Sequence, residues 1–230
     1  NFINNIAYLE RIFETLDEPV TVCDAEDAVE MPEIKGDVTF ENVTFAYEEG
    51  KDVLKNVSFT VKAGESVALV GPTGAGKSTI VNLISRFYNV GQGRVLIDGQ
   101  DIAKVTLRSL RSQMGIMLQD SFIFSGTIED NIRYGKLDAT TEEIVKASKT
   151  VCAHDFINRF TDGYQTEVKE RGSLLSQGQK QLISFARTLL SDPAILVLDE
   201  ATSSIDVQTE KALQQGLNAM LQGRTSFIIA

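Results

Sequence analysis

The sequence of 230 residues predicts an α/β fold, with a mixed or parallel sheet, an antiparallel β subdomain near the N-terminus and a helical insert later in the chain. Apolar runs at residues 67–70 and 194–198 are short and uninterrupted, as strands covered on both faces are. Strand-like segments joined by a turn fill residues 38–61, and helical spacing begins near residue 121. A chain of this length can bury a sizeable core as one large domain or two unequal subdomains.

Composition narrows the class of partner. The chain carries 22 Lys and Arg residues against 32 Asp and Glu residues, and this net charge of −10 repels a phosphate backbone, so we expect no nucleic-acid partner. Cys23 and Cys152 are far apart and have no metal-ligand neighbours, which is typical of a reducing compartment. No apolar run approaches the roughly 20 residues of a membrane span.

The first 33 residues predict a helix followed by a linker. Apolar side chains recur in steps of three and four, which places them on one face of a helix: Phe2, Ile6, Leu9, Phe13 and Leu16. We expect this face to meet either the core or a partner. Residues 21–33 are acidic and contain a proline, so we expect a solvated linker there and a domain boundary at its end.

Strand composition dominates residues 38–61, and residues 48–51 are typical of a hairpin tip. Tyr47 stands just before this tip. Its ring could stack on a flat base, a contact worth about 1 to 3 kcal/mol. Its spacing alone favours packing within the sheet.

The strongest motif of the sequence is residues 71–79, which follow the apolar run at residues 67–70. It matches the P-loop pattern G-x-x-x-x-G-K-[ST] and precedes an apolar helical segment. A glycine-rich turn between a strand and a helix directs backbone N–H groups and the positive end of the helix dipole at one point, which suits a phosphate. Lys77 would reach the β and γ phosphate oxygens, and the Ser78 hydroxyl would hold Mg²⁺. The predicted phosphate-binding residues are Gly71, Pro72, Thr73, Gly74, Ala75, Gly76, Lys77, Ser78 and Thr79.

Further strands are predicted at residues 93–97 and 116–118, the second ending just before Gln119. A helical insert then extends over about residues 121–190. Within it, Thr140 and Glu143 have the spacing of a capping box. His154 is the only histidine of the sequence and has no carboxylate or metal partner in view, so we assign it no role.

A second capping-box spacing, Ser176 with Gln179, opens a helix that extends to Leu190. Gly178 lies in the first turn of this helix, where glycine costs about 1 kcal/mol relative to alanine. We therefore expect something from outside the chain to approach closely at Gly178.

Carboxylates end the apolar run at residues 194–198, namely Asp199 and Glu200. In an open α/β sheet, ligands bind outside the carboxyl ends of the strands, where the P-loop also lies. Asp199 could complete the shell of Mg²⁺, and Glu200 could polarise an attacking water.

Together these motifs resemble those of the nucleotide-binding domain of an ATP-binding-cassette (ABC) transporter of the exporter type, over residues 34–230. The P-loop is similar to the Walker A motif and residues 195–199 to Walker B, with Glu200 at the place of the catalytic glutamate. The resemblance implies that Gln119 contacts Mg²⁺ and faces a membrane domain, and that Tyr47 stacks on adenine, against the preference from spacing. Asp206 resembles the D-loop residue that crosses between two such domains.

Residues 175–179 resemble the family signature L-S-G-G-Q, with Gln177 in place of the first glycine. The resemblance implies that four residues bind the γ-phosphate of ATP held by the P-loop of a second domain: Ser176, Gln177, Gly178 and Gln179. Residues 166–172 resemble the exporter loop T-E-V-G-E-R-G, with Lys169 in place of a glycine, and this loop favours exporters over other cassette ATPases.

The resemblance implies the ABC ATPase fold and an enzyme that uses ATP and Mg²⁺ to export a drug, lipid or peptide. The implied partners are a second nucleotide-binding domain, identical or related, and a membrane domain at the cytoplasmic side of the cell membrane. Residues 1–33 would then be the tail of the last membrane helix and an acidic linker. After a strand like residues 225–230 the family has a histidine that contacts the γ-phosphate, so we expect a C-terminally truncated domain that binds ATP but turns over slowly.

Two other classes share part of this pattern. A soluble cassette ATPase of DNA repair or chromosome structure commonly carries a long coiled coil between the Q-loop and the signature, but residues 120–174 show no sustained heptads. A P-loop kinase has no reason to carry the signature helix. Strong stimulation of ATPase activity by DNA would favour the repair class.

Overall fold

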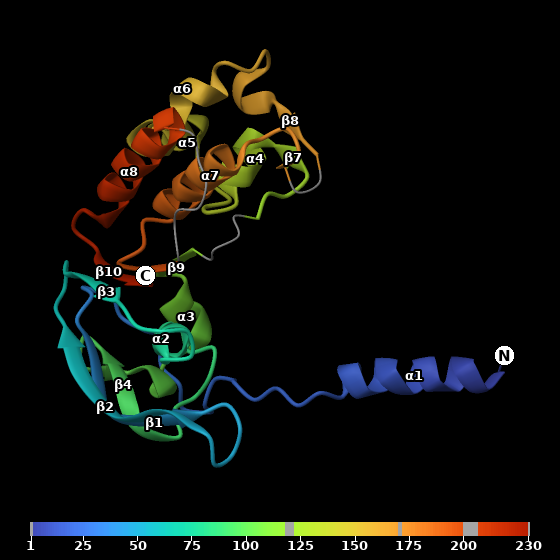
Figure 1. Cartoon of the computed structure of the whole chain (residues 1–230), viewed down its shortest axis with the longest axis vertical. Helices are drawn as coiled ribbons and strands as arrows, with labels where there is room; N and C mark the ends of the chain where they lie inside the picture. The colour runs from blue at the N-terminus through green and yellow to red at the C-terminus, as the bar shows by residue number, and fades with distance from the viewer. Residues whose placement is uncertain (1, 118–121, 170–171, 200–206, 230) are drawn as a thin grey trace.

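The computed structural model of the chain describes residues 2–117, 122–169, 172–199 and 207–229. Figure 1 shows a β-rich lobe and a helical lobe on opposite sides of a parallel sheet, with helix α1 (Phe2–Leu16) standing away from both lobes. The predicted α/β fold, with its antiparallel β subdomain and helical insert, is confirmed.

The β-rich lobe is built on an antiparallel sheet with the strand order β2-β1-β4-β5. Its strands are β1 (Val38–Ala46), β2 (Asp52–Val61), β4 (Gln92–Ile97) and β5 (Gln100–Asp101). The predicted hairpin tip lies between β1 and β2, where the Lys51 N–H donates to the Glu48 carbonyl at 3.1 Å. Within the strand-rich region predicted at residues 38–61, β1 is one continuous strand, and its register against β2 shifts between Phe40 and Phe45.

The parallel sheet has the strand order β3-β10-β9-β6. Its strands are β3 (Ser66–Leu69), β6 (Met114–Met117), β9 (Ile195–Asp199) and β10 (Thr225–Ile229), and all three pairings are parallel. Residues 195–198 of β9 are fully buried, as the uninterrupted apolar run predicts. Because side chains alternate along a strand, Ile195 and Val197 pack into one hydrophobic cluster while Leu196 and Leu198 pack into another.

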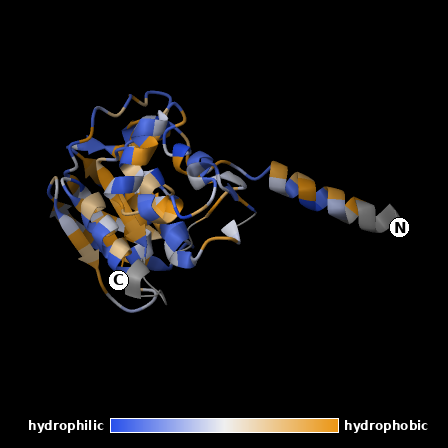
Figure 2. Cartoon of the chain, turned by 90° about the horizontal axis from the view of Figure 1, so that it is seen from above, coloured by the Kyte–Doolittle hydropathy of each residue, from blue (hydrophilic) through white to orange (hydrophobic). Residues whose placement is uncertain are grey.

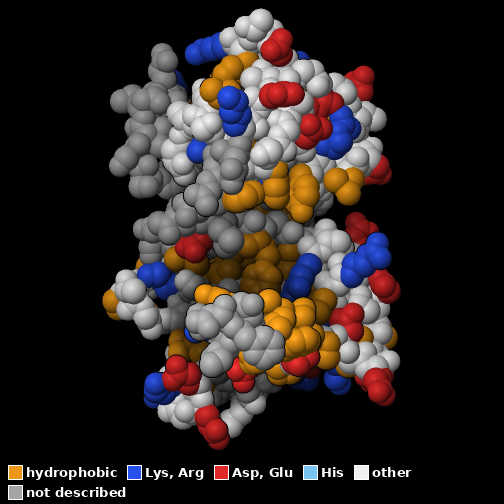
Figure 3. All heavy atoms as spheres, turned by 90° about the vertical axis from the view of Figure 1, so that its right-hand side faces the viewer, with side chains coloured by type: hydrophobic (Ala, Val, Ile, Leu, Met, Phe, Trp, Pro, Cys, Tyr) orange, Lys and Arg blue, Asp and Glu red, His pale blue; other side chains and the backbone are white. Residues whose placement is uncertain are grey.

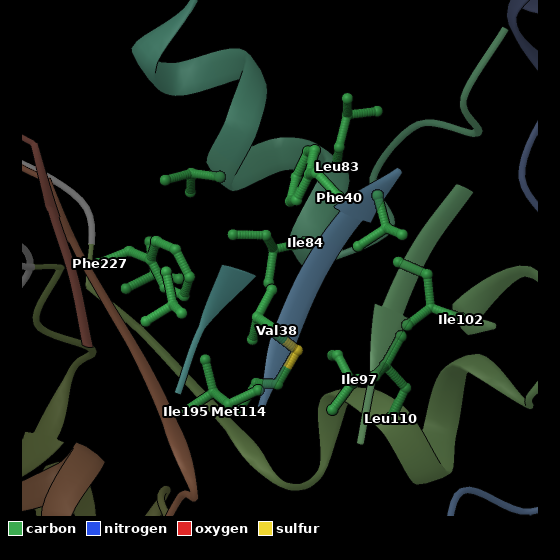
Figure 4. Packing of buried hydrophobic residues seen from close by; sticks show 14 of the residues in the cluster. Val38, Phe40, Leu83, Ile84, Ile97, Ile102, Leu110, Met114, Ile195 and Phe227 are labelled. Carbon is green, nitrogen blue, oxygen red and sulfur yellow. The ribbon is translucent and has the colours of Figure 1, made fainter. Parts of the chain in front are cut away.

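The first cluster fills the β-rich lobe. It joins the antiparallel sheet to α2 (Lys77–Ile84), to α3 (Leu107–Arg111) and to one face of the parallel sheet. A short 3₁₀ turn (Ile102–Lys104) closes it beside β5. Figure 4 shows the contributing side chains converging from these elements: Val38, Phe40, Leu83, Ile84, Ile97, Ile102, Leu110, Met114, Ile195 and Phe227.

The second cluster fills the helical lobe. Its helices are α4 (Ile128–Arg133), α5 (Thr141–Thr150), α6 (His154–Ile157), α7 (Gln177–Leu190) and α8 (Val207–Leu221). A two-stranded antiparallel ribbon (β7, Gly126–Thr127; β8, Glu167–Val168) and a 3₁₀ turn (Gly163–Gln165) complete the lobe. Helix α7 packs against α4, α5 and α8. The helical cluster therefore includes Leu213 and Met220 of α8, beyond the predicted end of the insert at residue 190.

Capping boxes explain where three helices of this lobe begin, namely α4, α5 and α7. Both predicted capping boxes form, at Thr140 with Glu143 and at Ser176 with Gln179. A third box at Thr127 opens α4; its partner is an aspartate, Asp130, which lies outside the Glu or Gln pattern used for prediction. The bonds that the Asp130 carboxylate accepts from the Thr127 backbone and side chain lower its pKa.

Helix α1 has the predicted apolar face but does not bury it. Ile6, Leu9, Phe13 and Leu16 are between 49% and 71% exposed, and Figure 2 shows the helix projecting from the body with hydrophobic and hydrophilic residues in alternation. The expectation that this face packs against the core is therefore wrong. Among the described residues, no helix combines the length and apolarity needed to cross a bilayer.

The linker at residues 21–33 keeps its acidic side chains in solvent, as predicted, but its backbone is tied to the β-rich lobe. The Arg86 guanidinium donates to the Cys23 carbonyl at 2.9 Å and to the Val105 carbonyl at 2.7 Å. The Met31 N–H donates to Ser109 Oγ at 2.8 Å, and Met31 itself is buried in the core. The linker therefore runs along the domain rather than freely through solvent.

Replacing Arg86 by methionine should loosen this attachment. Arg86 is 3% exposed, and hydrogen bonds from a charged donor are worth about 1.5 to 3 kcal/mol each. We expect Arg86→Met to lower the free energy of unfolding by about 2 to 4 kcal/mol in urea titrations and to speed proteolysis within residues 21–33. Arg108→Met is the matched control, because Arg108 is exposed and should change stability by less than about 0.5 kcal/mol. Equal stability of the two variants would contradict this role for Arg86.

Candidate functional site

The predicted P-loop connects β3 to α2 as a strand, an exposed glycine-rich turn and a helix. Its glycines adopt backbone angles that side chains rarely allow: φ is 153° at Gly71, 84° at Gly74 and 87° at Gly76. A bond from the Ala75 N–H to the Pro72 carbonyl at 3.1 Å tightens the turn. The loop thus has the shape that the sequence predicts for an anion cradle.

The first turn of α2 carries no side-chain cap. Its N-cap position is Gly76, which has no side chain to accept the free N–H groups of the helix. An anion at this end would satisfy those donors and would also interact favourably with the helix dipole. A β-carbon at Gly76 would lie 2.8 Å from Leu54 Cδ2 on β2, so a larger residue there would have to displace the Leu54 side chain or the loop.

Lys77 closes the loop on itself. Its Nζ donates to the Gly71 carbonyl at 2.5 Å, which links the two ends of the turn. An ammonium group has three donors, so two are left to reach phosphate oxygens. Ser78 follows on the exposed side of the helix, and Thr79 is buried.

Tyr47 lies directly after β1 and reaches α2. Its hydroxyl is 3.1 Å from Thr79 Oγ1 and accepts a bond from Asn82 Nδ2 at 3.2 Å. The ring packs edge-to-face with Phe45 and Tyr88 and remains 46% exposed. Packing within the lobe and a free ring surface are therefore both present at Tyr47. No pattern in the sequence indicates that Asn82 and Tyr88 support this ring.

Asp199 ends β9 at the edge of the sheet where the P-loop begins. Ile229 of β10 pairs with Leu69 of β3 on one side and with Asp199 on the other. Asp199 and the start of the P-loop are therefore level and two strands apart, about 10 Å at the usual strand spacing.

The oxygen donors on this edge suit Mg²⁺. The ion usually takes one or two protein oxygens and keeps several waters, so the Ser78 hydroxyl and the Asp199 carboxylate are enough for it. Within the part of the chain that the structure describes, no group of three or more His, Cys, Asp or Glu residues forms a metal cage.

The signature residues form the N-terminus of α7. Ser176 Oγ accepts from the Gln179 N–H at 3.3 Å, and Gln179 Oε1 accepts from the Ser176 N–H at 3.0 Å. Ser176 and Gln177 are exposed, while Gly178 is buried, so a visiting molecule would meet the first two. Helix α7 belongs to the helical lobe and α2 to the β-rich lobe (Figure 1), so one chain does not bring the signature and the P-loop together.

Three predicted site residues, Gln119, Glu200 and Asp206, lie outside the described residues. His154 lies in the helical lobe, where its ring nitrogens are 2.8 Å from the Tyr164 hydroxyl and 2.9 Å from Asn158 Nδ2. Both partners are uncharged side chains of the same lobe.

Comparison with known proteins places these motifs in a family. The profile of the family described as "ABC transporter" matches residues 54–203. The chain is 51% identical over 227 residues to the putative multidrug export ATP-binding/permease protein YgaD of Bacillus subtilis, covering 98% of the chain and 39% of that protein. It is 48% identical over 227 residues to the fatty acid ABC transporter ATP-binding/permease protein of Mycobacterium bovis, covering 99% of the chain and 36% of that protein.

A solved structure agrees with the sequence relatives. A bacterial Atm1-family ABC exporter with ATP bound superimposes with a TM-score of 0.87 at 44% identity, over 99% of this chain and 40% of that one. The chain thus spans about two fifths of the length of these relatives.

Two alanine substitutions separate the effect of crowding at Gly76 from the effect of its positive φ. Gly50, in the hairpin tip, has a similar φ of 80°, but a β-carbon there would meet nothing within 4 Å. Both Gly76→Ala and Gly50→Ala should cost about 1 kcal/mol of stability through φ alone. Only Gly76→Ala should also displace the P-loop, and we expect its ATP affinity to fall at least tenfold in calorimetric titrations. Equal ATP affinity in the two variants would show that the contact with Leu54 does not shape the loop.

Proposed function

The chain belongs to the ABC transporter family, and from this premise we propose that it binds and hydrolyses ATP as the nucleotide-binding domain of an exporter. The observation that carries the proposal is the uncapped N-terminus of α2 behind a glycine-rich loop, with Lys77 in reach and Asp199 on the same edge of the sheet. Each of these features stabilises negative charge or its counter-ion. A nucleoside triphosphate is the ligand that uses all of them.

Different residues would bind the base, the phosphates and the metal ion of the nucleotide. The exposed ring of Tyr47 would stack on adenine, while the backbone of residues 71–79 and the remaining donors of Lys77 would hold the phosphates. Ser78 and Asp199 would hold Mg²⁺, which when bound neutralises charge between the β and γ phosphates. Ser78 and Thr79 also belong to the first turn of α2, so the phosphates would bind directly at the dipole of this helix.

Hydrolysis needs a base and a positioned water. We assign the base to Glu200 and, beside the attacking water, a contact with Mg²⁺ to Gln119, on the strength of the sequence motifs. The water attacks the γ phosphorus, the bond from this phosphorus to the β–γ bridging oxygen breaks, and the proton of the water passes to the Glu200 carboxylate. ADP and inorganic phosphate leave.

A second nucleotide-binding domain would complete each site. Because Ser176 and Gln177 lie on the helical lobe and are exposed, they are free to meet the phosphates held by another chain. A head-to-tail pair would place the P-loop of each chain opposite residues 176–179 of the other. Asp206 would cross this interface. The pair can be identical chains or related ones.

A membrane domain is the second proposed partner, with the chain on the cytoplasmic side of the cell membrane. Figure 3 shows hydrophobic side chains gathered between the two lobes on the face from which α1 projects. Phe122, Phe124 and Tyr134 are exposed, and the ring of Phe124 contacts those of Phe122 and Tyr134, with centroids 4.9 and 4.8 Å apart. Such a patch suits burial against another protein.

We further infer that residues 1–33 are a connecting tail and linker, that residues 34–230 are the ATPase domain, and that ATP hydrolysis powers substrate export. The names of two relatives include a permease part, which supports the exporter. Nothing in these relatives supports the DNA-repair alternative, which a test of ATPase activity with added DNA would also detect.

Lys77→Ala tests the phosphate site. Removing the ammonium removes charge-assisted bonds to the β and γ oxygens, each worth about 1.5 to 3 kcal/mol, so ATP affinity should fall at least tenfold. Calorimetry with Mg-ATP measures this directly. Lys149→Ala, an exposed lysine on α5 in the helical lobe, is the control and should bind ATP as the parent chain does. Unchanged affinity in Lys77→Ala would refute the P-loop assignment.

Glu200→Gln tests the pairing of two domains. The substitution keeps the shape of the side chain but removes the base, so ATP should remain bound between two chains. We expect a dimer in gel filtration with Mg-ATP and a monomer without nucleotide, since ligand binding at an interface favours association. Adding Ser176→Arg should abolish this dimer but preserve ATP binding by the monomer. A monomer under all conditions would count against the head-to-tail site.

A further inference from the structure

We propose that Asn82 and Tyr88 are positioning residues that fix the ring of Tyr47, and that they thereby determine how much of the affinity for ATP comes from its base. This inference rests on the proposed binding of ATP and deepens it. It adds two residues of α2 and its C-terminal turn that the sequence motifs do not include.

The hydroxyl of Tyr47 is held from the side of the P-loop helix. Asn82 Nδ2 can only donate, so the Tyr47 oxygen accepts this bond at 3.2 Å, and the same oxygen is 3.1 Å from Thr79 Oγ1. Thr79 and Asn82 are three residues apart and therefore share one face of α2. Thr79 is 4% exposed, so its hydroxyl is a fixed point rather than a mobile surface group.

The ring of Tyr47 is fixed from a second side by other aromatic residues. Tyr88 lies 5.0 Å from it at an interplanar angle of 87°, and Phe45 lies 4.9 Å away at 89°. Tyr88 and Phe45 also contact each other at 5.7 Å. Edge-to-face pairs of this kind add stability beyond the area that they bury, and they resist rotation of the central ring.

These contacts give the exposed ring one orientation. Tyr47 follows the last residue of β1 and is 46% exposed, so without the contacts its two side-chain torsions would be free in solvent. Ordering such a side chain on binding costs conformational free energy, which a ring fixed in advance avoids. A flat base then meets a surface that is already in place.

The same helix positions both ends of the ligand. Helix α2 begins at Lys77, inside the phosphate cradle, and carries Thr79 on its first turn and Asn82 on the next. Helix α2 therefore holds the ring of Tyr47, the platform for the base, at a set distance from the phosphate cradle. Loss of the tether should weaken only the contribution of the base, because the loop that holds the phosphates does not depend on Tyr47.

Tripolyphosphate separates the two contributions, since it occupies a phosphate cradle but has no base. The experiment measures the dissociation constants of Mg-ATP and Mg-tripolyphosphate for the 230-residue chain by calorimetry. Tyr47→Ala should lower ATP affinity by about tenfold or more and leave tripolyphosphate affinity unchanged. Asn82→Leu and Tyr88→Leu should lower ATP affinity about threefold to tenfold, again without an effect on tripolyphosphate. Tyr88→Phe keeps the ring and should bind ATP as tightly as the unchanged chain does.

Tyr47→Phe is the second test of the tether, because it keeps the stacking surface and removes both bonds of the hydroxyl without touching α2. Tyr47→Phe should lower ATP affinity by the same factor as Asn82→Leu. If Asn82→Leu prevents folding, Tyr47→Phe tests the tether in its place. Equal losses for ATP and tripolyphosphate in Asn82→Leu would show a structural role and overturn the proposal. Unchanged ATP affinity in Tyr47→Phe and Tyr88→Leu would also overturn it. If Tyr47→Ala itself leaves ATP affinity unchanged, the adenine platform of the proposed function is wrong, and so is this proposal.

Discussion

Burial of β9 on both faces is the constraint on which the rest of the structure depends. Ile195 and Val197 belong to the core of the β-rich lobe, and Leu196 and Leu198 to the core of the helical lobe, so one strand joins two hydrophobic clusters. A charged side chain within this strand would have to lose its hydration without a partner. The first acidic residue therefore comes at its end, at Asp199, where the carboxyl edge of the sheet opens beside the P-loop.

Helix α2 is held at both ends, and each end faces a different part of the chain. Its N-terminus emerges from the P-loop, while Arg111 donates to the Ser85 and Arg86 carbonyls at its C-terminus, at 3.1 and 2.7 Å. Burial lowers the pKa of Arg111, and the nearby charge of Arg86 lowers it further. Arg86 in turn binds the linker that leads to α1. One short helix therefore connects the nucleotide-binding loop, the base platform at Tyr47 and the N-terminal linker.

Local patterns predicted most of this architecture. The apolar runs at β3 and β9, the capping boxes at Thr140 and Ser176 and the P-loop each depend on neighbouring residues, and all of them form. What could not be predicted depends on residues far apart in sequence. The bond of Arg86 to Cys23 spans 63 residues, and the contact of Tyr47 with Asn82 spans 35. The binding and catalytic roles of all the candidate site residues stay predictions, residues 119, 200 and 206 included, as does the domain boundary after residue 33.

The separation of the P-loop from residues 176–179 on two lobes is the basis of the central claim, that two chains build each site. The most direct measurement is the ATPase rate per chain as a function of chain concentration, at saturating Mg-ATP. A site shared between two chains predicts that this rate rises with concentration and approaches a plateau as the dimer fills. A rate per chain that stays constant from the most dilute measurable sample upward would mean that one chain hydrolyses ATP alone, and would contradict the account.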